Sequence, residues 1–549
     1  MRLLLIFVVS VSADLNWWKT ALVYQVYPRS FKDSDGDGIG DLKGVTEKLP
    51  YLKDTGIDAI WLSPIFLSPM RDVGYDISDY RKIAPEFGTM LDFEMLVRTA
   101  KELGLRIILD FVPNHTSNES EWFVRSQKSD PHYKDYYIWA DGITKEADQE
   151  MLPPSNWVSH FRKSAWKYSE ERGQYYLHQF VIGQPDLNYR NEKVQEEMKE
   201  VLRFWLDRGV SGFRVDAVNV LYEADPKNYG GRYPDESRSD DPSAVPDDYE
   251  YLKHIYTRDL DEVYTTIYDW RQVLDEYTSK GEYKFMVTEA YADVEHLMRY
   301  YGAEGRNGSV PFNFGLVDKV NKDTNVVEIK AIIDEWMTKM PAGKVASWVN
   351  GNHDQPRLAS RVGTNRVDAM NMLALILPGI AFTYQGEELG MTDGFISWED
   401  TQDPRACNTD DPVNYWKHSR DPCRTPFPWD GSLNAGFSTS DRTWLPVADN
   451  YKEVNLETEI TALKSHYKFY RDVAAIRKCD AIQKGRLDVK ALTESILVIV
   501  RWIPNAEAVV AIMNLSENTG TVDLSNMEML TVKLKVVASG VDCNGFENK

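Results

Sequence analysis

Hydrophobic residues along the chain gather in short continuous runs separated by amphipathic stretches. Such runs occur at 21–28, 58–65 and 105–112, and residues 89–103 carry apolar positions at the spacing of a helix. A run that is apolar throughout is typical of a strand buried on both faces, as in a parallel sheet. The pattern therefore predicts an α/β fold built on a parallel sheet or barrel. The same alternation resumes further along the chain, with runs at 211–218, 284–291, 344–352 and 380–388.

Two breaks divide this pattern into parts. Residues 113–186 are rich in aromatic residues, Pro and Gly and lack a helical repeat, which predicts a small inserted domain. From residue 479 short strands alternate with turns, which predicts an antiparallel β domain. The acidic stretch 223–250 reads as a long exposed loop. The predicted organisation is a signal peptide at 1–13, a barrel domain in two parts at 14–112 and 187–478, the inserted domain at 113–186, and the C-terminal domain at 479–549.

The first thirteen residues, MRLLLIFVVSVSA, have the layout of a secretory signal peptide. They combine one Arg, an apolar run and a small-residue site ending at Ala13, and they are too short to span a bilayer. No other segment reads as transmembrane, and the polar end at Lys549 carries no lipid-anchor signal. We therefore expect a secreted or extracellular protein.

Export permits disulfides and glycosylation. The four cysteines allow three pairings, and we favour Cys407 with Cys423 because the loop between them is rich in Asp, Pro and Asn and would need a crosslink. The formal net charge of −22 argues against nucleic acid or an anionic membrane surface as a partner. Acceptable N-glycosylation sequons begin at Asn118, Asn307 and Asn514.

Ionisable side chains recur where the predicted strands end. In a βα barrel the carboxyl ends of all strands meet at one mouth, so these side chains should converge there. Three carboxylates at one mouth favour hydrolysis of an acetal, which needs a nucleophile and a protonated acid. Each residue taken alone could equally be an ordinary strand-end cap. The side chains are Asp110, Asn114, His115, Arg214, Asp216, Glu289, His353 and Asp354.

Arg214 and Asp216 lie two positions apart in a predicted strand and therefore share a face. A guanidinium beside a carboxylate keeps that carboxylate ionised, as a nucleophile requires. A purely structural ion pair is the alternative. The sixteen Trp and thirty Tyr offer aromatic platforms for sugar rings, which fits carbohydrate as the substrate class.

The segment DSDGDGIGD, residues 33–41, carries acidic residues at alternate positions and would repel phosphate. This spacing favours calcium, with magnesium as the rival ion and a solvated acidic turn as the alternative. It is not an EF-hand, because the twelfth position is Gly44 rather than Glu. No organic cofactor is expected. The predicted calcium ligands are Asp33, Asp35, Asp37, the carbonyl of Ile39, and Asp41.

Several of these segments together resemble the α-amylase superfamily of glycoside hydrolases. The resemblance runs from about residue 17 to the C-terminal domain, and the motifs occur in the family's order. The segment VYPRSFKDSDGDGIGDLKG further resembles the α-glucosidase and oligo-1,6-glucosidase branch, and the chain looks closest to insect midgut maltases, mosquito ones included. The motifs are DFVPNH (110–115), QPDLN (184–188), GFRVDAVN (212–219), VTEA (287–290) and NGNHDQPR (350–357).

The resemblance implies a (β/α)8 TIM barrel with an inserted B domain and a C-terminal antiparallel β-sandwich. It implies a retaining, exo-acting α-glucosidase that releases glucose from maltose-like α-1,4-linked oligosaccharides, with sucrose as a further substrate. Asp216 would be the nucleophile, Glu289 the general acid/base and Asp354 the carboxylate that grips sugar hydroxyls. Ala217, rather than Val, goes with α-1,4 linkages in this branch.

The resemblance also assigns the glucose pocket. Asp72 and Arg420 would pair across it and close its far end, so that single glucoses are released. Asn114 would lie beside the site, so its sequon is expected to be unused. The remaining residues expected to line the pocket are Tyr75, His115, Arg214 and His353.

Three alternatives stay open at this stage. One is an inactive barrel that only binds, like the heavy chains of amino-acid transporters, which carry a transmembrane helix and lack the carboxylates. Another is a receptor for a bacterial larvicidal toxin at the midgut surface, a role of some mosquito gut maltases, with or without activity. The third is a homodimer. Anchored insect relatives continue into a hydrophobic tail, so we expect either free secretion or a truncated sequence.

Overall fold

The computed structural model describes residues 16–145, 151–303, 305–525, 527, 529–530 and 534–543. The predicted signal peptide at 1–13 lies outside this part of the chain. Over the described ranges, no helix has both the length and the apolar content needed to cross a membrane.

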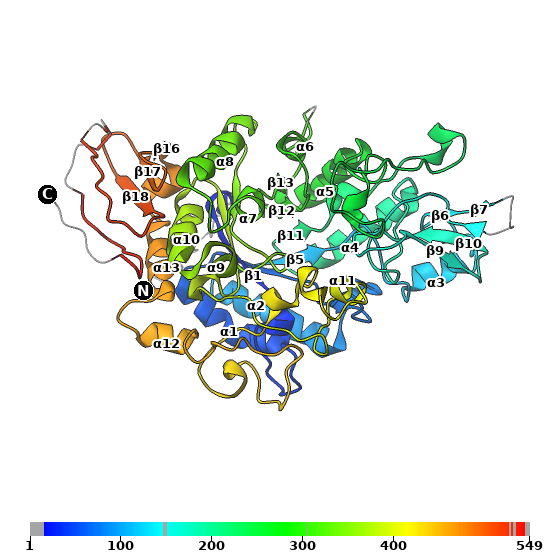
Figure 1. Ribbon diagram of the computed structural model, residues 1–549, viewed down its shortest axis with the longest axis horizontal. Coiled ribbons are helices and arrows are strands. Elements are labelled where there is room, and N and C mark those ends of the chain that lie inside the picture. The colour runs from blue at the N-terminus through cyan, green and yellow to red at the C-terminus, as the bar shows by residue number, and fades with distance from the viewer. Residues whose placement is uncertain are drawn as a thin grey trace, which may run out of the picture.

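Eight parallel strands form a barrel at the centre of the molecule (Figure 1). Their order in the sheet is β13-β12-β11-β5-β2-β1-β15-β14, so neighbours in the ring are also consecutive barrel strands along the chain. This arrangement confirms the predicted βα barrel. The strands are β1 (Leu22–Val26), β2 (Ala59–Leu62), β5 (Arg106–Phe111), β11 (Gly212–Val215), β12 (Phe285–Thr288), β13 (Val310–Pro311), β14 (Ser347–Val349) and β15 (Ile380–Tyr384).

The seam between β13 and β14, at the two ends of the sheet order, is bridged by a side chain. Ser347 Oγ donates to the Pro311 carbonyl at 2.8 Å and accepts from the Asn313 amide at 3.0 Å. The β13 strand has only two residues, too few to show any hydrophobic pattern, so the sequence did not predict it. The remaining seven barrel strands fall in the predicted runs.

Helices surround the barrel, and α4 shows why they form. Asn191 begins the helix by accepting a hydrogen bond from the Lys193 amide at 3.0 Å. The buried Val194, Met198 and Leu202 recur every four residues, so one face of the helix packs on the sheet. The helices between and after the barrel strands are α1 (Leu42–Thr55), α2 (Met90–Glu102), α4 (Glu192–Leu206), α5 (Glu262–Thr278), α6 (Val294–Arg299), α7 (Gly315–Asp318), α8 (Val326–Lys339), α9 (Leu358–Val362), α10 (Val367–Ile376) and α13 (His466–Ile476).

The segment between β5 and β11 forms a small body at one end of the molecule (Figure 1). It has its own cluster of buried side chains around Trp157 and Trp166. The acidic loop predicted at 223–250 is largely exposed, but it packs on this body, since Trp157 Nε1 donates to the Pro234 carbonyl at 2.9 Å. The elements are α3 (Glu121–Gln127), β6 (Trp139–Ala140), β7 (Ile143–Thr144), β8 (Met151–Leu152), β9 (Trp166–Ser169) and β10 (Gln174–Leu177), and earlier in the chain β3 (Phe66–Leu67) pairs with β4 (Asp79–Ile83).

The C-terminal part carries a three-stranded antiparallel sheet within the described residues. The buried Arg501 fastens it to the barrel domain by donating to the carbonyls of Ile376 at 2.7 Å and Ile482 at 2.6 Å. A second sheet, as a β-sandwich would need, is not among the elements described there. The elements of this part are α14 (Asp480–Lys484), β16 (Arg486–Ala491), β17 (Ile496–Trp502) and β18 (Ala508–Asn514). The short helices α11 (Pro404–Cys407) and α12 (Leu456–Thr461) lie earlier, in the segment between β15 and α13.

The predicted disulfide between Cys407 and Cys423 is wrong, because both thiols are free. Cys407 is exposed at the end of α11, whereas Cys423 is buried and its Sγ lies 3.3 Å from the His353 carbonyl. Hydrogen bonds crosslink the loop instead. Asp403 Oδ2 accepts from the backbone amide of Arg420 at 2.6 Å and from its Nε at 3.0 Å.

Candidate active site

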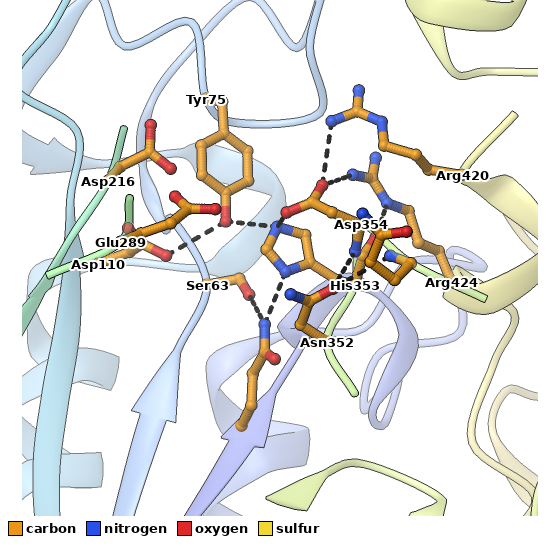
Figure 2. A network of polar contacts seen from close by, with 12 residues as sticks. Ser63, Tyr75, Asp110, Asp216, Glu289, Asn352, His353, Asp354, Arg420 and Arg424 are labelled. Atoms are coloured by element: carbon orange, nitrogen blue, oxygen red, sulfur yellow. Dashed lines mark hydrogen bonds and ion pairs between the residues drawn. The ribbon is translucent and has the colours of Figure 1, made fainter. Parts of the chain in front are cut away.

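The carboxyl ends of the barrel strands bring the predicted ionisable residues together (Figure 2). Asp110 lies in β5, Asp216 directly follows β11, and Glu289 directly follows β12. Asp354 lies in the loop after β14. These residues are far apart in sequence and share one mouth because their strands are parallel and start at the same end of the barrel.

Arg214 is the centre of the cluster. Its buried guanidinium donates from Nη1 to Asp110 Oδ1 at 2.8 Å and to Asp216 Oδ1 at 2.6 Å. Its Nη2 donates to Glu289. The strand register explains the contacts, since Arg214 pairs with Asp110 on one side and with Val287 of β12 on the other. One cation thus holds two candidate catalytic carboxyls side by side.

The two carboxyls differ in proton affinity. Burial raises the pKa of Asp216 to about 6, while the charge of Arg214 opposes this rise. Burial raises the pKa of Glu289 to about 8, again against Arg214, and the charges of Asp216 and Asp354 add to the rise. Glu289 therefore holds its proton more tightly than Asp216 does. That division matches a nucleophile beside a general acid.

Asp354 stays ionised on the opposite side of the mouth. Its Oδ1 accepts from Arg420 Nη1 at 3.1 Å and from Arg424 Nη2 at 2.9 Å. Burial opposes ionisation, but the positive charges of Arg420 and Arg424 lower the pKa of Asp354 below its usual range. Asn352 Oδ1 fixes the loop by accepting from the Asp354 amide at 2.9 Å. Asp354 is thus held as a fixed anion that can accept hydrogen bonds.

Tyr75 and His353 form a second connected pair. Their rings are stacked, with centroids 5.3 Å apart and planes 9° from parallel, and Tyr75 OH lies 2.6 Å from His353 Nε2. Tyr75 OH donates to Asp110 Oδ2 at 3.2 Å, and Gln25 Nε2 lies 2.8 Å from His353 Nδ1. Burial lowers the pKa of His353 well below its usual value, so the ring is neutral. Tyr75 and His353 therefore offer the site hydrogen-bonding groups and aromatic surface, but no charge.

Arg420 forms an ion pair with Asp72. Its Nη2 lies 2.8 Å from Asp72 Oδ1, as the sequence predicted, and 2.7 Å from Asp403 Oδ1. Asp72 lies between β3 and β4, and its Oδ2 accepts from Gln184 Nε2 at 3.1 Å. These contacts tie Arg420 to two aspartates from distant loops.

His115 and Ala217 complete the predicted set. His115 is buried against the Phe180 ring, 5.1 Å between centroids, and burial lowers its pKa to about 4. Ala217 has a left-handed backbone, with φ 45° and ψ 41°, and its amide donates to Glu289 Oε2 at 3.2 Å. Asn114 is 1% exposed, which fits the expectation that its sequon is unused.

Sequence reasoning missed three contributors to the site. Trp61, at the end of β2, donates from Nε1 to Asp110 at 3.1 Å. Arg424 lies four residues after Arg420 in the segment SRDPCRTP, so that segment could have revealed it. Nothing near Asp403 in the sequence signals its contact with Arg420, because the contact is made only by loop folding.

The predicted metal residues divide into two groups. Asp33, Asp35 and Asp37 each offer an oxygen, and these oxygens lie within 4.8 Å of one another. Asp41 lies outside that group and caps α1, its Oδ1 accepting from the Gly44 amide at 2.8 Å. Burial, followed by the charges of the neighbouring aspartates, raises the pKa of Asp37. A cation would relieve that repulsion, so the three side chains fit a calcium site.

The candidate glycosylation sites differ in accessibility. Asn307 and Asn514 are exposed. Asn118 is partly buried, and its Oδ1 is shielded from solvent without a hydrogen-bond partner.

Known proteins with the same architecture are numerous. The family model described as "Alpha amylase, catalytic domain" matches residues 25–485. Maltase A1 of Drosophila melanogaster is 50% identical and aligns over 98% of this chain and 94% of its own length. Salivary alpha-glucosidase of Anopheles gambiae is 47% identical over 96% and 89% of the two chains. The crystal structure of the alpha-glucosyl transfer enzyme XgtA superposes with a TM-score of 0.81 at 34% identity, covering 91% of each chain. The chain belongs to the α-amylase family.

Proposed function

We propose that the protein is a retaining α-glucosidase that removes single glucose units from maltose-like α-1,4-linked oligosaccharides. The observation that carries the proposal is the Arg214 cluster, in which one guanidinium contacts both Asp216 and Glu289. The pKa of Glu289, raised to about 8, lies above that of Asp216, raised to about 6, which suits an acid beside a nucleophile. The names of the relatives, maltase and salivary alpha-glucosidase, support the same activity.

The proposed reaction has two steps. In the first, an oxygen of Asp216 attacks the anomeric carbon of the glucose while Glu289 protonates the departing glycosidic oxygen. This forms a covalent glucosyl-enzyme ester. In the second step the ionised Glu289 takes a proton from water, which attacks the same carbon and releases Asp216. Two inversions return the α anomer. In this proposal Arg214 keeps its contacts with both carboxyl groups while Asp216 loses its charge by forming the ester and Glu289 becomes ionised.

The closed end of the site supports exo action. We place Arg420, with its ion pairs to Asp72 and Asp403, at the end of the glucose subsite, where it would stop a longer chain from continuing past the terminal glucose. We propose that Tyr75, His115, His353 and Asp354 surround that glucose, with Asp354 accepting from its hydroxyls.

A substrate panel tests the proposal directly. We expect glucose release from maltose, slower release from isomaltose, and almost none from starch, with α-glucose appearing first by NMR. Sucrose is included because it presents the same nonreducing glucosyl unit. Preferential cleavage of starch, or β-glucose as the first product, would contradict the exo-acting or the retaining assignment respectively.

Ala217 is the proposed determinant of linkage preference. Replacing it by Val is expected to raise the isomaltose-to-maltose activity ratio, because the larger side chain stands beside the Glu289 contact. A β-branched residue at this positive φ also costs about 1–3 kcal/mol of stability. Ala217→Gly is the matched control, since it removes the strain without adding bulk. Equal activity ratios in both variants would contradict the assignment.

We propose that Asp33, Asp35 and Asp37 bind calcium with a structural role. A ligand that binds only the folded state adds about 2.7 kcal/mol of stability at a concentration of 100 times its Kd. Chelation with EGTA is therefore expected to lower the melting temperature, and added Ca²⁺ to restore it. The double variant Asp35→Asn with Asp37→Asn should be insensitive to both treatments. An unchanged melting temperature in the native protein would refute the site.

Export is the proposed localisation, supported by the salivary relatives. None of the observed features favours a toxin-receptor role, a midgut-surface location or a homodimer. An inactive binding barrel is disfavoured because Asp216, Glu289 and Asp354 are all present and Arg214 contacts the first two.

A further inference from the structure

A cavity of about 380 Å³ lies at the end of the barrel opposite the active site. Its walls come from the residues that precede three barrel strands: Tyr283 before β12, Ser309 before β13, and Val345 before β14. It therefore lies beneath the β13–β14 seam, where the Ser347 side chain bridges the two strands. Any molecule in this cavity would contact both sides of that seam.

The walls combine aromatic surface with polar atoms that lack partners. Trp18 stacks on Tyr283 with centroids 5.0 Å apart and planes 17° from parallel. Trp18 Nε1 and Thr278 Oγ1 are shielded from solvent and make no hydrogen bond within the protein. Unpaired buried donors are costly, so they favour a ligand that supplies oxygen acceptors. Aromatic faces beside such donors suit a sugar ring.

Arg271 also lines the cavity, but its guanidinium is committed to the protein. The side chain is buried, and it donates from Nε to Asp275 Oδ1 at 2.9 Å and from Nη1 to the Lys284 carbonyl at 2.7 Å. Its Nη2 forms an ion pair with Asp275 Oδ1 at 2.8 Å and is shielded from solvent.

A candidate source of the sugar is attached to the rim. Asn307 lines the cavity, is exposed, and begins the sequon Asn307-Gly308-Ser309. Its position is fixed, since the Gly308 amide donates to the Tyr301 carbonyl at 3.3 Å and the Ser309 amide to the Tyr300 carbonyl at 2.8 Å. A Cβ on Gly308 would lie 2.0 Å from the Tyr300 carbonyl oxygen, so only glycine permits this turn. The first sugar of a glycan on Asn307 would begin at the cavity wall.

We propose that an N-linked glycan on Asn307 places its first N-acetylglucosamine in this cavity and braces the β13–β14 seam. During export, Asn307 Nδ2 forms a bond to C1 of N-acetylglucosamine from a lipid-pyrophosphate-linked oligosaccharide. Nδ2 loses one proton, and the lipid pyrophosphate leaves with the bonding electrons of the broken C1–O bond. The proposal rests on export of the chain and not on its glycosidase activity.

Enzymatic deglycosylation of the folded protein tests the proposal. Protein secreted from mammalian cells is treated with peptide-N-glycosidase F, which must reach the Asn–sugar bond, and each site is scored by mass spectrometry. We expect native Asn307 to resist release while exposed Asn514 is released, and both to be released after denaturation. A glycan on Asn514 with none on Asn307, or equal native release at both sites, overturns the cavity proposal. Absence of glycan at every sequon of the secreted protein also overturns it.

Variants separate sugar contact from general destabilisation. Trp18→Ala should make the native Asn307 glycan releasable, whereas Trp17→Ala, next to it but outside the cavity lining, should not. Asn307→Gln should lower the melting temperature, and Trp18→Ala should then lower it less in the Asn307→Gln background than in the glycosylated protein. Additive shifts would show that Trp18 acts without the glycan and would overturn the proposal.

Discussion

Replacing Asp216 by Asn is expected to lower kcat for maltose by about 10⁴-fold or more while leaving the fold intact. The amide keeps the size and hydrogen-bonding oxygen of the carboxylate but cannot form the glucosyl ester. The fold should survive because Arg214 keeps its contacts with Asp110 and Glu289. Initial rates with maltose and a thermal melt measure the two effects.

An external nucleophile identifies the role of Asp216 more sharply. With Asp216→Gly, an activated aryl α-glucoside and azide, we expect β-glucosyl azide, because azide attacks the substrate once and inverts it. Asp58→Asn is the matched control, since this aspartate precedes β2 at the opposite end of the barrel and pairs with Lys478. It should keep full activity. An Asp216→Asn enzyme that still hydrolyses maltose would rule out the nucleophile assignment.

The barrel was predictable from sequence because buried parallel strands are apolar on both faces. The runs at 21–28 and 105–112 contain β1 and β5 for that reason. The sixth barrel strand, β13, was not predicted, because a strand of two residues shows no hydrophobic periodicity. Its connection to β14 across the seam is made by the Ser347 side chain. Its position depends on the closure of the whole ring.

Site residues that lie at the ends of barrel strands were predictable from the sequence. Contacts between residues of two different loops were not. Asp216 and Glu289 follow apolar runs, so topology alone brings them to one mouth. The contact of Asp403 with Arg420 depends on how two loops fold together, which local sequence does not encode. The disulfide prediction failed in the same loop. Its composition indicated that the loop needs a crosslink, but it did not indicate that the contact between Asp403 and Arg420 supplies one in place of a disulfide.

Replacing Glu289 by Gln should separate the two steps of the reaction. For maltose, whose leaving group needs a proton, we expect a loss of about 10²–10⁴-fold. An aryl α-glucoside with an acidic phenol leaves without help, so the glucosyl-enzyme should form and then accumulate, since no base activates water. Azide should restore turnover and give α-glucosyl azide, the opposite anomer from the Asp216→Gly product. A burst of phenol followed by slow turnover is the kinetic sign of the trapped ester.

The pH dependence of the same variant tests the pairing of the two carboxyls. For the native enzyme, kcat/KM should rise as Asp216 loses its proton near its pKa of about 6. It should fall as Glu289 loses its proton near its pKa of about 8. In Glu289→Gln with the aryl glucoside the alkaline limb should disappear while the acid limb persists. If the alkaline limb survives, another group supplies the proton, and the divided roles of the two carboxyls around Arg214 would have to be abandoned.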